Sequence, residues 1–331
     1  MNAQGATEPG AAGTNRWRRP RVASVVERLR GGGIGVHLLV FAFGAMVLVI
    51  TGMLAWQLFV HSALARQKFG LSFLVTQTWD PVTGEFGAAP FIYGTLVTSA
   101  IALLVAVPVG VAVAIFLAEL AHPKVSDACG LLLELLAAVP SVIYGLVGIA
   151  ILVPLMREWI EPGLRAATGG FPLFSGPALG VGYLTAGLVL AVMVTPFIVS
   201  VSREVLIAVP RAQREAALAL GSTKWESTWK VVLPYARPGI YGAIFLALGR
   251  ALGETMAVTM VIGNRPSIAA SLFAPGYSMA AVVANEFAEA GAGEYLAALT
   301  YIGLVLFLLT MLINGTARLL IMATTREGSG T

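Results

Sequence analysis

Six long apolar runs constrain this chain more than any other feature of its sequence. Each is about as long as the roughly 20 residues that an α-helix needs to cross ~30 Å of hydrocarbon. None shows the strict alternation of apolar and polar residues that a transmembrane β-barrel requires. We therefore predict an all-α membrane protein with six transmembrane helices. The runs are Val36–Val60, Tyr93–Leu120, Gly130–Met156, Leu179–Val201, Gly239–Gly263 and Leu296–Leu320.

Composition supports this prediction. The chain has 331 residues, of which 57% are hydrophobic and only 11% are charged, whereas soluble domains are about 25% charged. The first run is too long for the apolar region of a cleaved signal peptide. Cys129 is the only cysteine, so an internal disulfide and a cysteine metal cluster are both excluded. The three histidines lie far apart at the ends of runs, which favours ordinary interfacial residues over a metal site.

Basic residues predict the orientation in the membrane, because Lys and Arg gather on the cytoplasmic side. Fifteen of them fall on one side of the six predicted helices and five on the other. The larger set is Arg16, Arg18, Arg19, Arg21, Arg28, Arg30, Lys124, Arg203, Arg211, Arg214, Lys224, Lys230, Arg237, Arg318 and Arg326. The smaller set is Arg66, Lys68, Arg157, Arg165 and Arg265. We predict cytoplasmic termini, and we interpret the pI of about 9.4 as topology and contact with the lipid bilayer, not as nucleic-acid binding.

The predicted organisation follows from these runs. A basic leader, residues 1–35, is expected to be disordered or to lie at the membrane surface. The first helix spans 36–60, a structured extracytoplasmic loop spans 61–92, and a core of five helices spans 93–320. A cytoplasmic loop, 202–237, interrupts this core, and a cytoplasmic tail spans 321–331. Pro108, Pro140 and Pro196 fall inside apolar runs, where each is expected to kink a helix.

The cytoplasmic loop carries local signals for a helix, a turn and a second helix. Pro210 suits a first helical turn, and residues 211–220 are strong helix formers. Gly221 fits the position just after the helix, where a left-handed residue ends it at little cost. Thr223 and Glu226 form a capping box that starts a second helix. That helix is expected to stop at Pro234.

Arg250 and Glu254 place two charges near the middle of the fifth run. Charges at the bilayer centre cost at least ~2.5–3.5 kcal/mol on insertion scales, so they usually face a partner or a water-filled cavity. At positions i and i+4 they share a helix face and can neutralise one another. The structural alternative is a pair that joins two helices. Glu134 is a third intramembrane acid, for which we favour a structural role.

The functional interpretation of this pair is a site for an anion on a translocation path. An arginine fork suits any tetrahedral oxyanion. A neighbouring carboxylate repels anions unless the substrate has a proton to donate, which phosphate has at neutral pH and sulfate lacks. A buried acceptor left unpaired is penalised strongly, so such a site discriminates between the two. The residues Arg250 and Glu254 therefore favour phosphate.

Other functions find less support in the sequence. There is no G-x-x-x-x-G-K-[ST] motif, so the chain has no P-loop with which to hold ATP. Motifs of serine, zinc and aspartyl hydrolases are also missing, which argues against an intramembrane enzyme. No cofactor is predicted in this chain. A secondary transporter, which needs no ATPase, stays open as an alternative at this point.

The spacing of several residues in the cytoplasmic loop resembles that in the permeases of ABC importers. Their cytoplasmic loop has an E-A-A triplet, a glycine and a Leu-Pro pair, and this sequence matches it with Glu215, Ala216, Ala217, Gly221, Leu233 and Pro234. Val231 stands where that family usually has isoleucine. Further segments resemble the permeases of phosphate ABC importers: Pro90–Ser99, Leu133–Gly148, Gly182–Leu206 and, most specifically, GRALGETMAVTMVIGN at Gly249–Asn264.

This resemblance implies a type I ABC importer permease fold and a set of partners. A second homologous permease would complete the pore, two ATPase subunits would bind ATP and Mg²⁺ below it, and an extracytoplasmic binding protein would deliver phosphate. The helix around Glu215–Gly221 would dock into an ATPase and transmit its motion. The second permease of the same system and a permease for sulfate or molybdate are the alternatives.

Overall fold

The computed structural model describes the backbone of residues 33–327 and the side chains of residues 35–319. Residues 1–32 and 328–331 lie outside the described residues, and with them most of the predicted leader, 1–35, and the end of the predicted tail, 321–331. The chain divides into two units at Trp56 and Gln57. The first is mostly α2 (Gly33–His61), an apolar helix long enough to span a membrane. The helices and strands after α2 all belong to the second unit.

Six helical stretches of the described chain are long and apolar enough to cross a membrane, which confirms the predicted fold class. They are Gly35–His61, Ala89–Leu120, Ser141–Ala167, Tyr183–Ile207, Lys224–Leu252 and Glu294–Leu319. Four of these six overlap the predicted runs closely. The third and the fifth differ from the prediction in ways that decide where the candidate site residues lie.

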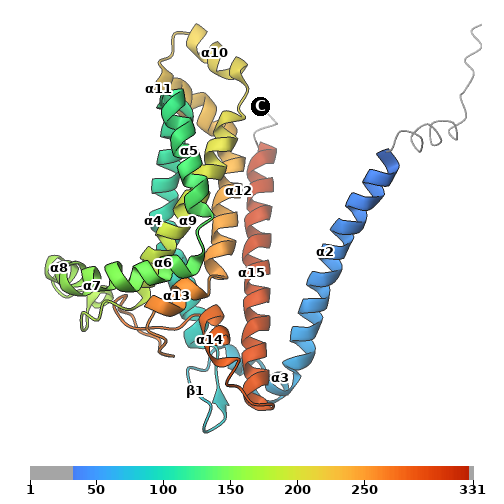
Figure 1. Ribbon diagram of the computed structural model, residues 1–331, viewed down its shortest axis with the longest axis vertical. Helices are drawn as coiled ribbons and strands as arrows, with labels where there is room; N and C mark the ends of the chain where they lie inside the picture. The colour runs from blue at the N-terminus through green and yellow to red at the C-terminus, as the bar shows by residue number, and fades with distance from the viewer. Residues whose placement is uncertain (1–32, 328–331) are drawn as a thin grey trace, which may run out of the picture. The chain divides into compact units, whose positions relative to one another are not determined.

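A bundle of five helices forms the body of the second unit (Figure 1). α4 (Ala89–Ile115) and α9 (Tyr183–Ile207) pack along their lengths. α12 (Leu233–Leu252) packs on both and on α15 (Glu294–Glu327), and α5 (Pro123–Ala137) runs along α9. Pro108 and Pro196 lie inside α4 and α9 and end neither helix. The helix α15 continues seven residues into the predicted tail.

Small residues allow the bundle helices to approach closely, as expected for helices that pack in a membrane. The central core is rich in alanine, with Ala102, Ala106 and Ala186 fully buried between α4 and α9. A Cβ atom added at Gly110 would lie 2.8 Å from a methyl carbon of Ile198. A small residue therefore allows close packing of α4 and α9 at this position.

The prediction of a single helix over the third run, Gly130–Met156, is wrong. The chain breaks at Pro140, which has extended backbone angles and precedes the first turn of α6 (Ser141–Val147). Proline has no N–H to donate to the preceding turn, so α5 closes before it. The N–H of Ala138 donates to the carbonyl of Glu134 at 3.1 Å and ends α5 there.

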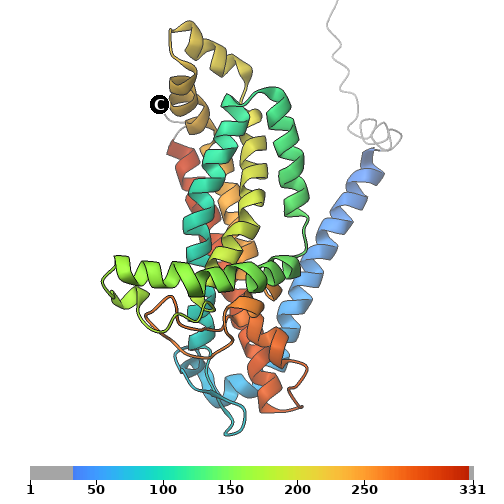
Figure 2. The same cartoon turned by 60° about the vertical axis from the view of Figure 1, so that its left-hand side comes forward.

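After this break the chain lies across the bundle instead of running along it. The stretch contains α6, π-helical turns, α7 (Val153–Leu155) and α8 (Glu161–Ala167). Figure 2 shows it at a steep angle to α4 and α9. Residues 141–167 have the length and composition of a membrane span, but α5, which precedes them, runs along only the part of the bundle nearer α10 (Figure 1).

The fifth predicted run, Gly239–Gly263, is also broken. α12 ends at Leu252, and a separate helix, α13 (Met256–Val261), begins after three intervening residues. The next short helix, α14 (Met279–Glu286), leads into α15. A charged pair at i and i+4 thus lies at a helix end and not within one helix.

The end of the bundle formed by α3 (Ala63–Phe69), α14 and the start of α15 carries a compact cap. Its centre is an antiparallel hairpin of β1 (Trp79–Asp80) and β2 (Glu85–Phe86). One carboxylate oxygen of Glu286 accepts hydrogen bonds from the Trp79 indole at 2.9 Å and from the Tyr295 hydroxyl at 2.8 Å. The expected structured loop is therefore tied to α14 and α15.

Replacing Glu286 with alanine should loosen this cap. The change removes the acceptor of two hydrogen bonds to a charged group, and we expect the free energy of unfolding to fall by about 1–3 kcal/mol. Thermal unfolding followed by tryptophan fluorescence measures it. Glu289→Ala, which removes an exposed carboxylate one turn away, is the matched control. Equal melting temperatures for the two variants would show that the Glu286 hydrogen bonds do not hold the hairpin.

Candidate functional site

A helical hairpin closes the end of the bundle opposite the β-hairpin (Figure 1). Its first helix, α10 (Arg211–Ala219), ends at a Schellman motif. Gly221 has a φ of 87°. Its N–H donates to the Leu218 carbonyl at 2.9 Å, and the N–H of Ser222 donates to the Ala217 carbonyl at 3.2 Å. The helix end predicted at the glycine is confirmed.

The second half of the hairpin begins with the predicted capping box. The backbone N–H of Glu226 donates to the Thr223 hydroxyl at 3.2 Å, and the Glu226 carboxylate accepts from the Thr223 N–H at 3.0 Å. α11 (Lys224–Ser227) continues through a π-helical turn, Thr228–Val232, directly into α12. The predicted stop at Pro234 is wrong. This proline lies within the continuous helical stretch, directly after the π-helical turn, and does not end it.

The E-A-A triplet lies on α10 and exposes most of its surface. Glu215 and Ala216 are exposed, whereas Ala217 is buried against the rest of the hairpin. Leu218 and Leu220 are 44% and 89% exposed, which is high for an apolar side chain such as leucine. Leu233, in contrast, is half-buried at the start of α12. The hairpin thus presents a carboxylate and two apolar side chains to whatever lies beyond this end of the bundle.

Arg214 fastens this hairpin to the bundle, and sequence reasoning missed its role. Its guanidinium binds the Glu119 carboxylate through two nitrogens, with a closest distance of 2.7 Å. It also donates to the carbonyls of Leu206 at 2.7 Å, in the last turn of α9, and of Val209 at 2.6 Å, just beyond that helix. The side chain of Glu119 is only 10% exposed. One arginine therefore joins α10, α9 and the end of α4.

These contacts make the hairpin a rigid extension of the two central helices. Charge-assisted, bidentate pairs are among the strongest polar contacts in proteins. The hollow beside the pair has a volume of about 430 Å³ and is lined by Glu119, Arg214, Glu215 and Leu218, among others. A force applied to α10 would reach α4 and α9 through Arg214. The only sequence signal for this contact is an acid at the end of the second run and a basic residue beside the E-A-A triplet.

The two intramembrane charges predicted to pair do not do so. Within the described residues, Arg250 and Glu254 form no ion pair, because α12 ends between them. One oxygen of Glu254 accepts instead from the N–H of Ala257 at 3.3 Å and caps the start of α13. The expectation that they neutralise one another on one helix face is therefore wrong.

The Arg250 guanidinium lies exposed near the junction of α5 and α6. It acts electrostatically on the Tyr144 hydroxyl, which donates to the Leu136 carbonyl at the end of α5 at 2.7 Å. Glu134, one turn from this junction, is also exposed. A cation that has no carboxylate partner among the described residues can receive an anion. The broken helices beside it are typical of backbone that lines a cavity in a membrane protein.

No group of three or more His, Cys, Asp or Glu side chains in the described part of the chain is arranged to hold a metal ion. The described residues thus offer two candidate sites: the exposed hairpin at one end, and Arg250, which has no ion pair among them, at the breaks between α5 and α6 and between α12 and α13.

Comparison with known proteins identifies the family. Residues 106–321 match the family described as binding-protein-dependent transport system inner membrane component. The chain belongs to this permease family. The matched residues include α5 to α14, the hairpin and the broken helices, so both candidate sites lie within the part that defines these permeases. The family and the six apolar helical stretches make the chain a multi-pass membrane protein and a transport component.

Curated relatives cover most of this permease. A phosphate transport system permease protein PstC of Mesorhizobium japonicum is 47% identical over 290 residues, which are 86% of this chain and 89% of that one. The protein of the same name from Pasteurella multocida is 48% identical over 289 residues, 86% of this chain and 88% of its own. A probable one from Methanocaldococcus jannaschii is 38% identical and covers 77% and 83% of the two chains.

Solved structures agree on the fold of the permease. A bacterial alginate ABC transporter, in complex with a periplasmic protein that carries an alginate pentasaccharide, contains a chain with a TM-score of 0.56. The match covers 88% of this chain and 96% of that chain at 15% identity. A bacterial ABC transporter that imports alginate gives a TM-score of 0.54 at 15% identity, with 92% and 99% covered. These likenesses support the ABC importer permease fold.

Proposed function

We propose that this permease forms half of the translocation pore of an ATP-driven importer of inorganic phosphate. The observation that carries the proposal is the 47% identity to a phosphate transport permease over 86% of the chain. Arg250, which has no ion pair among the described residues, supports it independently, because an arginine within a membrane-spanning protein suits an oxyanion. The chain itself would supply the path and the coupling, and not the chemistry of ATP hydrolysis.

The proposed assembly has four further subunits. A second, homologous permease would close the other half of the pore, and two ATPase subunits, each binding ATP and Mg²⁺, would sit on the cytoplasmic side. An extracytoplasmic binding protein would bring phosphate to the cap formed by β1, β2 and α14. The excess of basic residues at the hairpin end supports a cytoplasmic location for that end and for both termini.

The proposed mechanism runs from the hairpin to the site. α10 docks in a groove of the ATPase through Glu215, Ala216 and the exposed Leu218. Closure of the ATPases pulls on α10, and the Arg214–Glu119 contact carries this motion to α4 and α9 as a rigid-body shift. Arg250 and Glu254 lie where α12 breaks, so a tilt of these helices would change which side of the membrane the Arg250 guanidinium faces.

Glu254 is proposed to select phosphate. It keeps one oxygen on the N–H of Ala257, which leaves the other free to accept a hydrogen bond from the O–H of a hydrogen phosphate. Sulfate has no proton at neutral pH and would face an unpaired carboxylate, a penalty that sites of this kind use to discriminate. A sulfate or molybdate permease therefore remains the weaker alternative. The other alternative is the second permease of a phosphate system. The relatives described above are named PstC, which argues against it.

Reconstitution of the chain with candidate partners tests the proposal. The chain, a second permease, the ATPase and a phosphate-binding protein are placed in vesicles, and ATP hydrolysis is measured with phosphate, sulfate or molybdate outside. We expect stimulation by phosphate alone. Stimulation by sulfate or molybdate would mean that this anion is a substrate in place of phosphate alone. Uptake by the chain without any ATPase would mean that the chain is a secondary transporter.

Gly221→Val should weaken docking of the hairpin through the backbone. No atom lies within 4 Å of a Cβ added at this glycine, so a side chain fits there and the strain comes from the positive φ alone. A non-glycine residue in this conformation costs about 1–2 kcal/mol, which corresponds to a roughly five- to thirtyfold weaker association if docking needs this geometry. The measurement is the amount of ATPase that co-purifies with the permease.

The matched control is Gly221→Asn, because asparagine tolerates the left-handed region far better than valine does. We expect this variant to retain most of the ATPase. If valine and asparagine at this position leave equal amounts of ATPase bound, the shape of the α10–α11 turn does not matter for assembly.

A further inference from the structure

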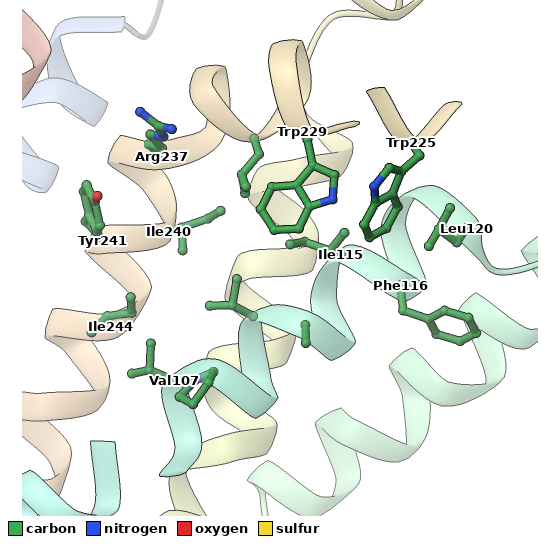
Figure 3. A pocket seen from close by; sticks show the side chains of 14 residues that line it. Val107, Ile115, Phe116, Leu120, Trp225, Trp229, Arg237, Ile240, Tyr241 and Ile244 are labelled. Carbon is green, nitrogen blue, oxygen red and sulfur yellow. The ribbon is translucent and has the colours of Figure 1, made fainter. Parts of the chain in front are cut away.

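A long apolar hollow runs along the outside of the bundle next to the hairpin (Figure 3). Its volume is about 540 Å³, and α4, the π-helical turn after α11, and α12 form its walls. Val107, Val111, Ile115, Ile240 and Ile244 line its depth. Ile115 and Ile240 are buried, whereas Phe116 and Tyr241, which also line the hollow, are 50% and 41% exposed. The hollow therefore opens on the outer surface of the bundle, which in a membrane protein faces lipid.

The end of the hollow nearest the hairpin is built differently from its depth. Trp225 and Trp229 contact each other edge to face at 5.5 Å, and they are 54% and 46% exposed. Arg237 stands at the same end on α12. Within the described residues Arg237 has no ion pair and no hydrogen bond from its side chain. Tryptophan and arginine are typical of the depth at which the hydrocarbon meets the headgroups.

The spacing of these groups fits that depth. Arg237 lies one turn after the start of α12, and the lining on this helix continues to Ile244, seven residues or about 10 Å further. The apolar walls therefore extend from the level of the headgroups well into one leaflet. A hollow with this profile matches one molecule with an apolar chain and a negatively charged head.

Other occupants fit less well. A water-soluble ligand would find a single cation and apolar walls, which offer too few hydrogen bonds. An apolar helix of another subunit could fill the walls but would leave the charge of Arg237 without a partner next to lipid. A phospholipid with an anionic head satisfies both parts at once, because its phosphate pairs with the guanidinium while its acyl chain replaces water along the hollow.

We infer that this hollow is a binding site for an anionic phospholipid, whose acyl chain lies between α4 and α12 and whose headgroup binds Arg237. The lipid would pack against Trp229 directly beside the hairpin that follows α9. The inference rests on the chain spanning a membrane and does not depend on phosphate being the substrate.

Fluorescence quenching tests this site. The full chain is reconstituted in phosphatidylcholine vesicles that contain an increasing fraction of brominated phosphatidylglycerol or of brominated phosphatidylcholine. A Trp225→Phe, Trp229→Phe double variant gives the fluorescence of the other tryptophans. The difference between the parent chain and this variant is the fluorescence of the two tryptophans at the hollow. One well-placed cation favours an anionic lipid by about fivefold. We expect half-maximal quenching at about a fivefold lower fraction of the anionic lipid.

Variants at Arg237 decide whether the arginine is responsible. Arg237→Gln should abolish the preference for phosphatidylglycerol, and Arg237→Lys, which keeps the charge, should retain most of it. Arg318→Gln removes an exposed arginine on α15 away from the hollow and should change nothing. Equal quenching by both brominated lipids in the parent chain would overturn the inference. So would a lack of quenching by either lipid, which would mean that a protein segment fills the hollow.

Discussion

Arg214→Ala should abolish stimulation of ATP hydrolysis by substrate while the permease still inserts into the membrane. The change leaves the Glu119 carboxylate, 10% exposed, without its cation and removes donors from two carbonyls at the end of α9. Breaking such a pair costs roughly 2–5 kcal/mol, most of it where the hairpin meets the bundle. We expect stimulated hydrolysis and uptake to fall by at least about tenfold.

Arg211→Ala is the matched control for this prediction. It removes an exposed arginine one turn earlier on the same helix, which has no ion pair among the described residues. Arg214→Lys keeps the charge but cannot form the fork, so it should fall between the parent and Arg214→Ala. The readouts are phosphate uptake, stimulated ATP hydrolysis and the amount of permease in the membrane. If Arg214→Ala performs like Arg211→Ala, the contact with Glu119 does not carry the coupling.

Arg250→Ala should remove phosphate transport without preventing assembly of the importer. The guanidinium is the one charged donor proposed for the substrate, and removing an electrostatic contact of this kind typically costs about 10²–10³ in rate. Uptake of radioactive phosphate measures the loss, and unstimulated ATP hydrolysis should persist. Arg265→Ala, an exposed arginine beyond α13, should leave uptake near that of the parent.

Glu254→Gln should change selectivity more than stability. Glutamine keeps an oxygen for the Ala257 N–H but offers an amide donor where the carboxylate accepted a hydrogen bond. We expect the preference for phosphate over sulfate to fall by at least about tenfold, because sulfate no longer meets an unpaired carboxylate. Competition of sulfate with phosphate uptake measures this. Unchanged competition would show that Glu254 only caps α13.

Local chemistry explains what could be predicted from the sequence. The Schellman end at Gly221 and the capping box of Thr223 and Glu226 depend on residues within six positions of one another, so both could be read from the loop alone. The apolar runs are equally local, since each depends on ~20 consecutive residues. For this reason the fold class and the hairpin were predicted correctly.

Non-local contacts explain what could not be predicted. Arg214 and Glu119 are 95 positions apart, and no pattern in the sequence pairs them. The break after α5 was partly visible in Pro140, but the direction of α6 to α8 depends on packing against α9 and α13. The end of α12 at Leu252 has no proline to mark it, so the helical pairing of Arg250 with Glu254 was a natural but wrong prediction.

Cross-linking from the tip of α10 tests the central claim most directly, namely that this hairpin is where the permease meets its ATPase. Cysteine is placed at Leu218 or, as a control at the opposite end of the bundle, at exposed Thr83, in a chain whose single native cysteine is changed by Cys129→Ser. A short bifunctional cross-linker is then applied to membranes that contain the whole importer. We expect position 218 to link to the ATPase, and to do so differently with and without ATP, while position 83 does not link to it. Linkage from position 83, or none from position 218 in an importer that still transports, would contradict the assignment of the hairpin.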